Sequence, residues 1–340
     1  MDATTTVITA PRLGTFEERW DALVAALPIP TPFLTSWWLG SFAGPEACFV
    51  LVVEDGELLG GVAFETDTWL GVRRFRMLGQ RIIQPDHLDL IAHPDRRGTV
   101  EARLGEWLTR NGARFFDLDG LVPDSRLAAI LPRPVQNWGE TPVPFATLPG
   151  TLDEYLEEHS KLRTQVPRAR RRLERDGVET RVVGSGDIER ALDDLASLHA
   201  ARWGDESQFL ERFEEFRAAV SAGALRNEVV VVELVSHGEV IASEIDFVAG
   251  STMHFYQAGR ATDHAWRGSG NVVKAAAIDV ACARNLEEYD MLRGDEPYKQ
   301  DWADDSRRVV HLRSAHGLRA RALLAASRVR RRLAKSGGGH

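Results

Sequence analysis

The chain has 340 residues, of which 44% are hydrophobic and 27% are charged, and its formal net charge is −8. This length allows two domains, each with its own core, and the composition is that of an ordinary globular protein. The two cysteines, Cys48 and Cys282, lie far apart in apolar surroundings, which argues against a disulfide framework or a CxxC metal site and indicates buried thiols in a reducing compartment.

The N-terminal residues 1–12 lack a basic segment followed by an apolar stretch. A run of about 18 apolar residues, as a membrane span requires, occurs nowhere in the sequence. We therefore expect neither a signal peptide nor a transmembrane helix, and we predict a cytoplasmic protein.

The charge is unevenly distributed. Residues 161–175 carry +6 and residues 317–335 carry +7, which leaves −21 on the rest of the chain. Two basic helices on an acidic body indicate contact with a polyanion, such as a phosphorylated cofactor, tRNA or a lipid surface, or else form solvated helix faces. The second segment also has apolar residues at helical spacing, so it can dock on the body or lie on a membrane surface: Leu318, Ala322, Leu323, Ala326, Val329 and Leu333.

In the first half, residues 15–27 predict a helix with Thr15 as its N-cap, and residues 35–38 predict the start of another. Two apolar runs, 49–53 and 58–64, flank the turn at Asp55-Gly56 and predict a β-hairpin. Further strands are expected at 75–78, 88–92 and 114–118, with a helix at about 99–111.

The same order recurs in the second half. Helices are predicted at 192–203 and 209–222, and strands at 229–234 and 240–247 flank a turn at 236–239. The segment 55–64 aligns with 237–247, and 113–120 resembles 286–294. We therefore predict a duplicated unit, with the Pro-rich stretch 131–149 as linker and a boundary near residue 145.

The second half contains a candidate phosphate cradle. A predicted strand at 252–258 is followed by a polar loop, by Arg267, Gly268, Ser269 and Gly270, and then by a helix at 272–284. Glycines at a helix start let an anion approach the free N–H groups of the first turn, and Arg267 adds a positive charge. The corresponding segment of the first half, 93–98, has a single glycine and is expected to have lost cofactor binding.

A short apolar strand near 286–292 leads into a loop with the sequence RGDEPYKQDW at 293–302. Gly294 and Pro297 end the strand and gather charged residues on one loop. Loops anchored by a rigid strand often carry binding and catalytic residues, although a solvated turn with paired charges would have the same composition.

These motifs resemble the GCN5-related N-acetyltransferase (GNAT) fold. More narrowly, they resemble the acetyltransferase family associated with cellulose biosynthesis (CelD/BcsL-like), a relative of the FemAB transferases, which also have two GNAT units. The resemblance is carried by LHAARW at 198–203, by 241–242, 256–259 and 267–270, and above all by 290–302. Polar Asn271 departs from the apolar residue that is usual in the family.

The resemblance implies an α+β protein with two GNAT-like units, each a mixed, mostly antiparallel sheet flanked by helices. We assign 1–145 to a degenerate unit, 146–316 to an acyltransferase unit and 317–340 to a basic helix with a disordered tail. It also implies direct transfer of an acyl group from acetyl-CoA or another acyl-CoA, bound at Arg267, Gly268, Ser269 and Gly270, to an amine or hydroxyl.

Catalytic residues are predicted on two elements. Glu244 and Asp246 are two residues apart and share one face of a strand, so either can serve as general base unless that face is solvated. Tyr298 and Lys299 form the preferred pair on the substrate side, because the phenol can donate a proton and the ammonium can hold a phosphate or carboxylate.

Substrate contacts are predicted at Tyr256, Arg293 and Asp295, and His254 shares a face with Tyr256. The acceptor is expected to be a small molecule or a cell-envelope precursor. Aminoacyl-tRNA-dependent transfer, as in the FemAB relatives, and a non-catalytic GNAT-like binding protein are the alternatives. The sequence shows neither a DNA-reading module nor metal-ligand spacing, so we expect no metal and no DNA partner.

Overall fold

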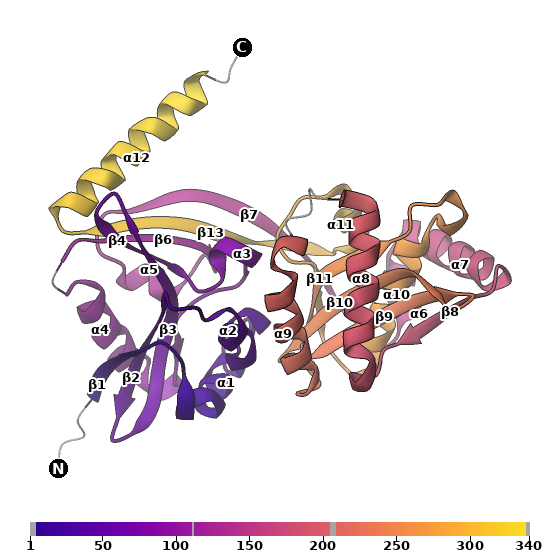
Figure 1. The fold of residues 1–340 in the computed structure, drawn as a ribbon, viewed down its shortest axis with the longest axis horizontal. Helices are drawn as coiled ribbons and strands as arrows, with labels where there is room; N and C mark the ends of the chain where they lie inside the picture. Colours follow the sequence, from indigo (N-terminus) through magenta and orange to yellow (C-terminus); the bar gives the residue numbers. More distant parts are fainter. Residues whose placement is uncertain (1–4, 111, 205–208, 338–340) are drawn as a thin grey trace. The chain divides into compact units, whose positions relative to one another are not determined.

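The computed structural model describes residues 5–110, 112–204 and 209–337 (Figure 1). The chain forms two compact units, which we describe separately. The first takes in Met1–Ile29, Phe33–Thr141 and Arg308–His340, and the second takes in Pro30–Pro32 and Pro142–Arg307.

The second unit is built on a mixed sheet with the strand order β7-β12-β11-β10-β9-β8. Neighbouring strands are antiparallel except for β11 and β12, which run parallel and are joined through a helix, as a parallel pair requires. The strands are β7 (Val135–Thr147), β8 (Val178–Val182), β9 (Val229–Ser236), β10 (Glu239–Ala249), β11 (Thr252–Arg260) and β12 (Glu288–Asp290).

Helices cover both faces of this sheet: α8 and α9 lie on one face, and α10 lies on the other with α7 beside it (Figure 1). A capping box formed by Thr151 and Glu154 starts α6, the first helix of this unit. The helices are α6 (Leu152–Glu158), α7 (Ser160–Arg175), α8 (Ile188–Trp203), α9 (Phe213–Ala224), α10 (Ser269–Ala283) and α11 (Pro297–Trp302).

The first unit repeats this plan with the strand order β1-β2-β3-β4-β6-β13, and β4 and β6 form its parallel pair. Its strands are β1 (Thr5–Ala10), β2 (Ala47–Glu54), β3 (Glu57–Trp69), β4 (Val72–Met77), β5 (Ile91–Ala92), β6 (Arg114–Leu121) and β13 (Asp305–His316). Its helices are α1 (Glu17–Ala25), α2 (Ser36–Phe42), α3 (Gln80–Ile83), α4 (Arg97–Leu108), α5 (Arg126–Ile130) and α12 (Leu318–Gly337).

The two predicted hairpins are confirmed as β2–β3 and β9–β10. Their turns have the same backbone conformation, since φ is positive at both Asp55 and Gly56 and at both His237 and Gly238, as in the turns that match strand twist. The predicted fold class, α+β with mixed sheets flanked by helices, is therefore confirmed.

Two segments differ from the sequence-based division. The stretch 131–149, predicted as a linker, mostly forms strand β7, which begins in the first unit and ends in the second. Strand β13, assigned from the sequence to the second half, pairs with β6 of the first unit.

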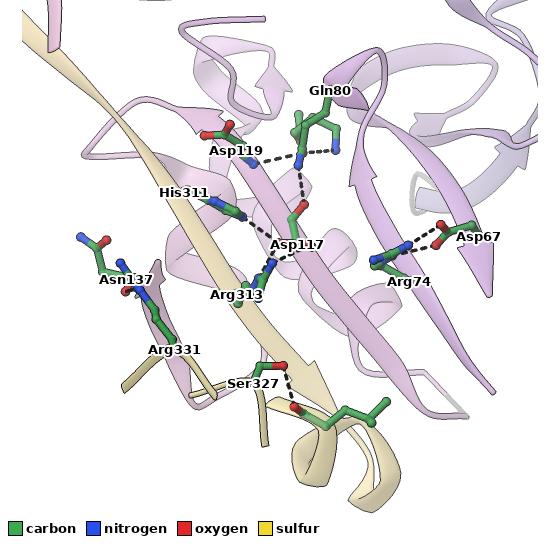
Figure 2. Close-up of polar contacts among 12 residues, drawn as sticks. Asp67, Arg74, Gln80, Asp117, Asp119, Asn137, His311, Arg313, Ser327 and Arg331 are labelled. Atoms are coloured by element: carbon green, nitrogen blue, oxygen red, sulfur yellow. Dashed lines mark hydrogen bonds and ion pairs between the residues drawn. The ribbon is translucent and has the colours of Figure 1, made fainter. Parts of the chain in front are cut away.

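Asp117 fixes β13 to β6. Its carboxylate accepts hydrogen bonds from His311 Nε2 (2.6 Å) and Arg313 Nε (2.7 Å), both on β13 (Figure 2). Burial alone would raise the pKa of Asp117, but these two partners hold it below its usual value. Composition could not predict this pairing, because it joins residues nearly two hundred positions apart.

The basic C-terminal helix is present as α12. Its first half packs Ala320 and Leu324 on Val72 and Phe115 of the first unit, and Arg331 donates to the carbonyl of Asn137 (3.3 Å, Figure 2). The predicted tail begins at Gly337, which ends α12, and its other residues lie outside the described part of the chain.

Candidate functional site

Residues 268–270, predicted from the sequence as a phosphate cradle, form the N-cap and first turn of α10. Gly268 is its N-cap and has φ +87°, a conformation that favours glycine. Ser269 follows as the first helical residue; it is fully buried, and within the described part of the chain its Oγ has no hydrogen-bond partner. A buried hydroxyl without a partner costs about 1–3 kcal/mol, so an anion bound at this turn would give Ser269 the acceptor that it lacks.

Gly270 adds no side chain to the same turn. A Cβ placed there would lie 3.7 Å from Cδ of Arg260, an ordinary van der Waals contact, so the backbone does not require glycine at this position. The helix is 15 residues long, and its unpaired N–H groups and dipole favour a negative charge at the first turn. Arg267, just before the turn, is exposed.

Helix α7 packs directly on this cradle. Arg172 donates from Nη2 to the carbonyl of Arg267, and a Cβ at Gly268 would lie 3.0 Å from Cβ of Ala169. Asn271, the departure from the family pattern, lies 3.4 Å from Oε1 of Gln165 through its Nδ2. The polar residue thus links α10 to α7 instead of entering the core.

Glu244 and Asp246 lie together in a buried polar cluster on the α10 face of the sheet. The hydroxyl of Tyr289 is 2.7 Å from Oε1 of Glu244 and 2.9 Å from Oδ1 of Asp246. Lys274 Nζ is 3.1 Å from Oε1 of Glu244, 3.2 Å from the Tyr289 hydroxyl and 3.4 Å from the ring centroid of Phe255.

One phenolic proton cannot be donated to two carboxylates, so the cluster needs a second proton. Burial, followed by the charge of Glu244, raises the pKa of Asp246 well above its usual value. Burial and the two carboxyl groups also raise the pKa of Tyr289. Burial therefore favours the protonated form of Asp246 and the phenol form of Tyr289, while Glu244 lies within ion-pair distance of Lys274.

The cluster lies where β11 and β12 separate. The parallel pairing ends at His254 and Asp290. The chain after Asp290 follows β7 instead, because the N–H of Met291 donates to the carbonyl of Pro144 (2.9 Å). The edge of β11 beyond His254 is therefore not paired to β12, and the β10–β11 register shifts at this level, between Ile245 and Asp246.

Tyr298 lies at the surface on α11, where the residue is 42% exposed. Partial burial, together with the charges of Glu296 and Glu244, raises the pKa of Tyr298, so it remains a phenol at neutral pH. The hydroxyl keeps its proton, and the raised pKa makes it a weaker acid than an ordinary tyrosine.

Lys299, the predicted partner of Tyr298, is almost fully buried and faces its own loop. Its Nζ lies 2.7 Å from the carbonyl of Arg293, 3.3 Å from that of Leu292 and 3.0 Å from Oε2 of Glu296. These contacts use the three donors of an ammonium group. Lys299 thus holds the 292–296 loop, and its predicted contact with a phosphate or carboxylate of the substrate stays a prediction.

The residues predicted to contact the substrate lie in two places, on strand β11 and on the 292–296 loop. The ring of Tyr256 stacks on that of Phe216, with centroids 5.2 Å apart, and His254 is fully buried. Arg293 is half-buried and Asp295 is exposed, both on the loop that Lys299 holds. Tyr256 therefore packs in an aromatic cluster on the α9 side of the sheet.

Sequence reasoning missed Lys274 and Tyr289. Lys274 is the only cation in α10, whose other residues are mostly small and apolar. A lysine within a helix that is buried on most sides must be paired with a negative group. The lone lysine in an apolar helix could therefore have predicted an ion pair with Glu244. Tyr289 was assigned to the core as an apolar strand residue, and its hydroxyl becomes informative only when the strands are placed.

The first unit has a different helix start at the position of the cradle. Helix α4 begins at Arg97, and its N-cap is Arg96, whose guanidinium pairs with Glu54. Arginine side chains thus stand where the second unit has Gly268 and Ser269.

Within the described ranges, no group of three or more His, Cys, Asp or Glu residues is arranged to hold a metal ion. Nor does any described helix combine the length and apolar character that crossing a membrane demands.

Residues 160–300 match the family of acetyltransferase (GNAT) domains. This match lies within the second unit and includes both the cradle and the buried cluster. The fold is GNAT-like. None of the curated protein sequences matches the chain significantly.

Solved structures share this fold over most of the chain. The crystal structure of FemX has a TM-score of 0.65 and 11% identity, over 94% of this chain and 99% of FemX. L-PGS from Bacillus licheniformis has a TM-score of 0.55 and 12% identity, over 87% and 91%. The C-terminal domain (DUF2156) of a putative lysylphosphatidylglycerol synthetase from Agrobacterium fabrum has a TM-score of 0.52 and 14% identity, over 91% and 95%.

Proposed function

We propose that the protein is an acyltransferase that moves an acyl group from an acyl-CoA, such as acetyl-CoA, to an amine or hydroxyl of a small or envelope-related acceptor. The observation that carries the proposal is the first turn of α10, where Gly268 and Gly270 bring no side chains and the buried Ser269 hydroxyl has no hydrogen-bond partner among the described residues, beside N–H groups of the kind that bind anions at helix starts. The match of residues 160–300 to the acetyltransferase domain family supports the same chemistry.

In the proposed reaction, the acceptor nitrogen or oxygen attacks the thioester carbonyl, its bond to carbon forms, and the carbon–sulfur bond breaks. The acceptor loses one proton, and the leaving thiolate gains one. Glu244, the carboxylate of the buried cluster, is the proposed base, and Tyr289 and Lys274 position it. Tyr298, a partly exposed phenol on α11, is the proposed acid.

The test is the release of free thiol from acetyl-CoA and longer acyl-CoAs, measured against a panel of amines, amino sugars and sugar alcohols. The proposal expects thiol release that requires an acceptor and that falls at least about 100-fold in Glu244→Gln. Gln300→Ala is the control, because Gln300 is exposed on α11 and outside the cluster. Equal release by the wild type and Glu244→Gln would contradict the assignment of the base.

Aminoacyl-tRNA-dependent transfer is a second candidate, favoured by the basic helix α7 beside the cradle. It predicts salt-sensitive binding of aminoacyl-tRNA and transfer that no acyl-CoA supports. The finer assignment to the CelD/BcsL-like family rests on the 290–302 motif and stays a prediction.

A further inference from the structure

We propose that Arg168, Arg172 and Arg267 form a second phosphate subsite next to the α10 cradle, which takes the 3′-phosphate of coenzyme A. This inference rests on the proposed function, because it assumes that the cradle holds the diphosphate of the same donor. It explains why a strongly basic helix packs on the cradle of an otherwise acidic protein.

The contacts of α7 fix which of its faces meets the cradle. Gln165, Ala169 and Arg172 all face residues 267–271, and their spacing of four and three places them on one stripe of the helix. The core-facing stripe lies to one side of it and consists of Leu162, Val166 and Leu173.

Arg168 lies on the other side of the contact stripe. It is three residues after Gln165 and four before Arg172, so it occupies the row adjacent to the cradle on the side away from the core. Arg168 and Arg267 are both exposed. Their guanidinium groups can therefore reach an anion bound at the surface of this turn.

Arg172 supplies a second argument. Its Nη2 donates to the carbonyl of Arg267, but its Nε is shielded from solvent and has no hydrogen-bond partner among the residues that the structure describes. Buried N–H groups are normally paired, and an unpaired one calls for an explanation, of which a bound ion is one. Since a guanidinium suits phosphate oxygens, a phosphate monoester fits this need.

Coenzyme A carries its 3′-phosphate on the same nucleotide as the diphosphate, so an arginine cluster beside a diphosphate cradle matches its charge distribution. Thioesters on a phosphopantetheine arm lack this phosphate. The subsite would therefore select free acyl-CoA over an acylated carrier protein.

The experiment is isothermal titration of coenzyme A and 3′-dephospho-coenzyme A into the full-length protein, its Arg168→Gln variant and its Arg163→Gln variant. Arg163 is the matched control because it lies on the same helix, away from the cradle, and pairs with Glu157 at 3.1 Å. We expect coenzyme A to bind at least about 10-fold more tightly than the dephospho form to the wild type and to Arg163→Gln, as charge-assisted bonds to a phosphate require. In Arg168→Gln the ratio of the two affinities, coenzyme A over 3′-dephospho-coenzyme A, should fall to about 3 or less.

Equal affinities for the two ligands in the wild type would overturn the subsite while leaving the proposed function intact. Binding of neither ligand would overturn both. If a tRNA acceptor-stem duplex binds and Arg168→Gln weakens it without changing the coenzyme A ratio, the arginines serve a nucleic acid, and the inference is wrong.

Discussion

The hydroxyl of Tyr289 lies 2.9 Å from Oδ1 of Asp246, and both residues are fully buried. The same hydroxyl also contacts Glu244, so the Asp246 contact requires a proton that an ionised carboxylate would not supply. The proton on Asp246 can therefore be tested through the pH dependence of the protein's stability.

Asp246→Asn should be increasingly stabilising as pH rises. Burial and Glu244 raise the pKa of Asp246 in the folded state, whereas an unfolded Asp has a pKa of about 3.9. Above that value the folded protein holds a proton that the unfolded chain releases, so wild-type stability falls with pH, by at most about 1.4 kcal/mol per pH unit from this group. Asparagine does not titrate, so the variant lacks this loss of stability with pH.

The measurement is the difference in urea midpoint between Asp246→Asn and the wild type at pH 5 and at pH 8. Asp279→Asn, on α10 but outside the cluster, is the control for a lost carboxylate. A difference that is constant or shrinks with pH would mean that Asp246 is ionised in the folded protein.

Lys274→Met should destabilise the second unit by about 3–5 kcal/mol, because it leaves Glu244 buried without its cation. The double variant Glu244→Gln/Lys274→Met should lose less than the sum of the two single variants. Chemical denaturation of all four proteins measures this coupling. Additive losses would show that Lys274 and Glu244 do not pair.

Lys299→Ala should lower the melting temperature as well as activity. Its ammonium holds the carbonyls of Leu292 and Arg293 and the carboxylate of Glu296, and removing the charged hydrogen bonds of a buried ammonium costs about 2–3 kcal/mol. Differential scanning calorimetry, with Gln300→Ala as control, checks this. An unchanged melting temperature with a raised KM for the acceptor would favour the substrate contact predicted from the sequence.

Tyr298→Phe should reduce kcat by about 100-fold with little change in folding, since the ring is partly exposed and only the hydroxyl is lost. A thioester whose leaving thiol has a low pKa needs no proton, so it should be transferred by Tyr298→Phe nearly as well as by the wild type. Equal losses with both donors would exclude Tyr298 as the acid.

Local patterns predicted the elements of the fold well. The turns at Asp55-Gly56 and His237-Gly238 predicted both hairpins, since these residues accept positive φ. The same reasoning failed at 131–149, where Pro-rich composition indicated a linker and the structure has strand β7. Proline is tolerated in strands at positions that need no N–H donor, and only the partner strands show which positions those are.

The site could be predicted only in part. Glycines before a helix indicated the cradle, and a two-residue spacing put Glu244 and Asp246 on one face. The roles of Lys299 and Tyr289 depend on contacts with residues from other elements, and Lys299 in particular turns to backbone carbonyls of its own loop. Charge and residue type on a loop do not reveal whether a donor is already used.

The central claim is that the first turn of α10 holds the phosphates of the acyl donor. Titration of acetyl-CoA into the wild type, Gly270→Asp and Gly270→Ser tests it most directly, because a side chain fits at 270 and an acidic residue in a first turn stabilises the helix. We predict micromolar binding to the wild type, retained in Gly270→Ser and lost in Gly270→Asp at an unchanged melting temperature. Binding that Gly270→Asp leaves intact would contradict the claim.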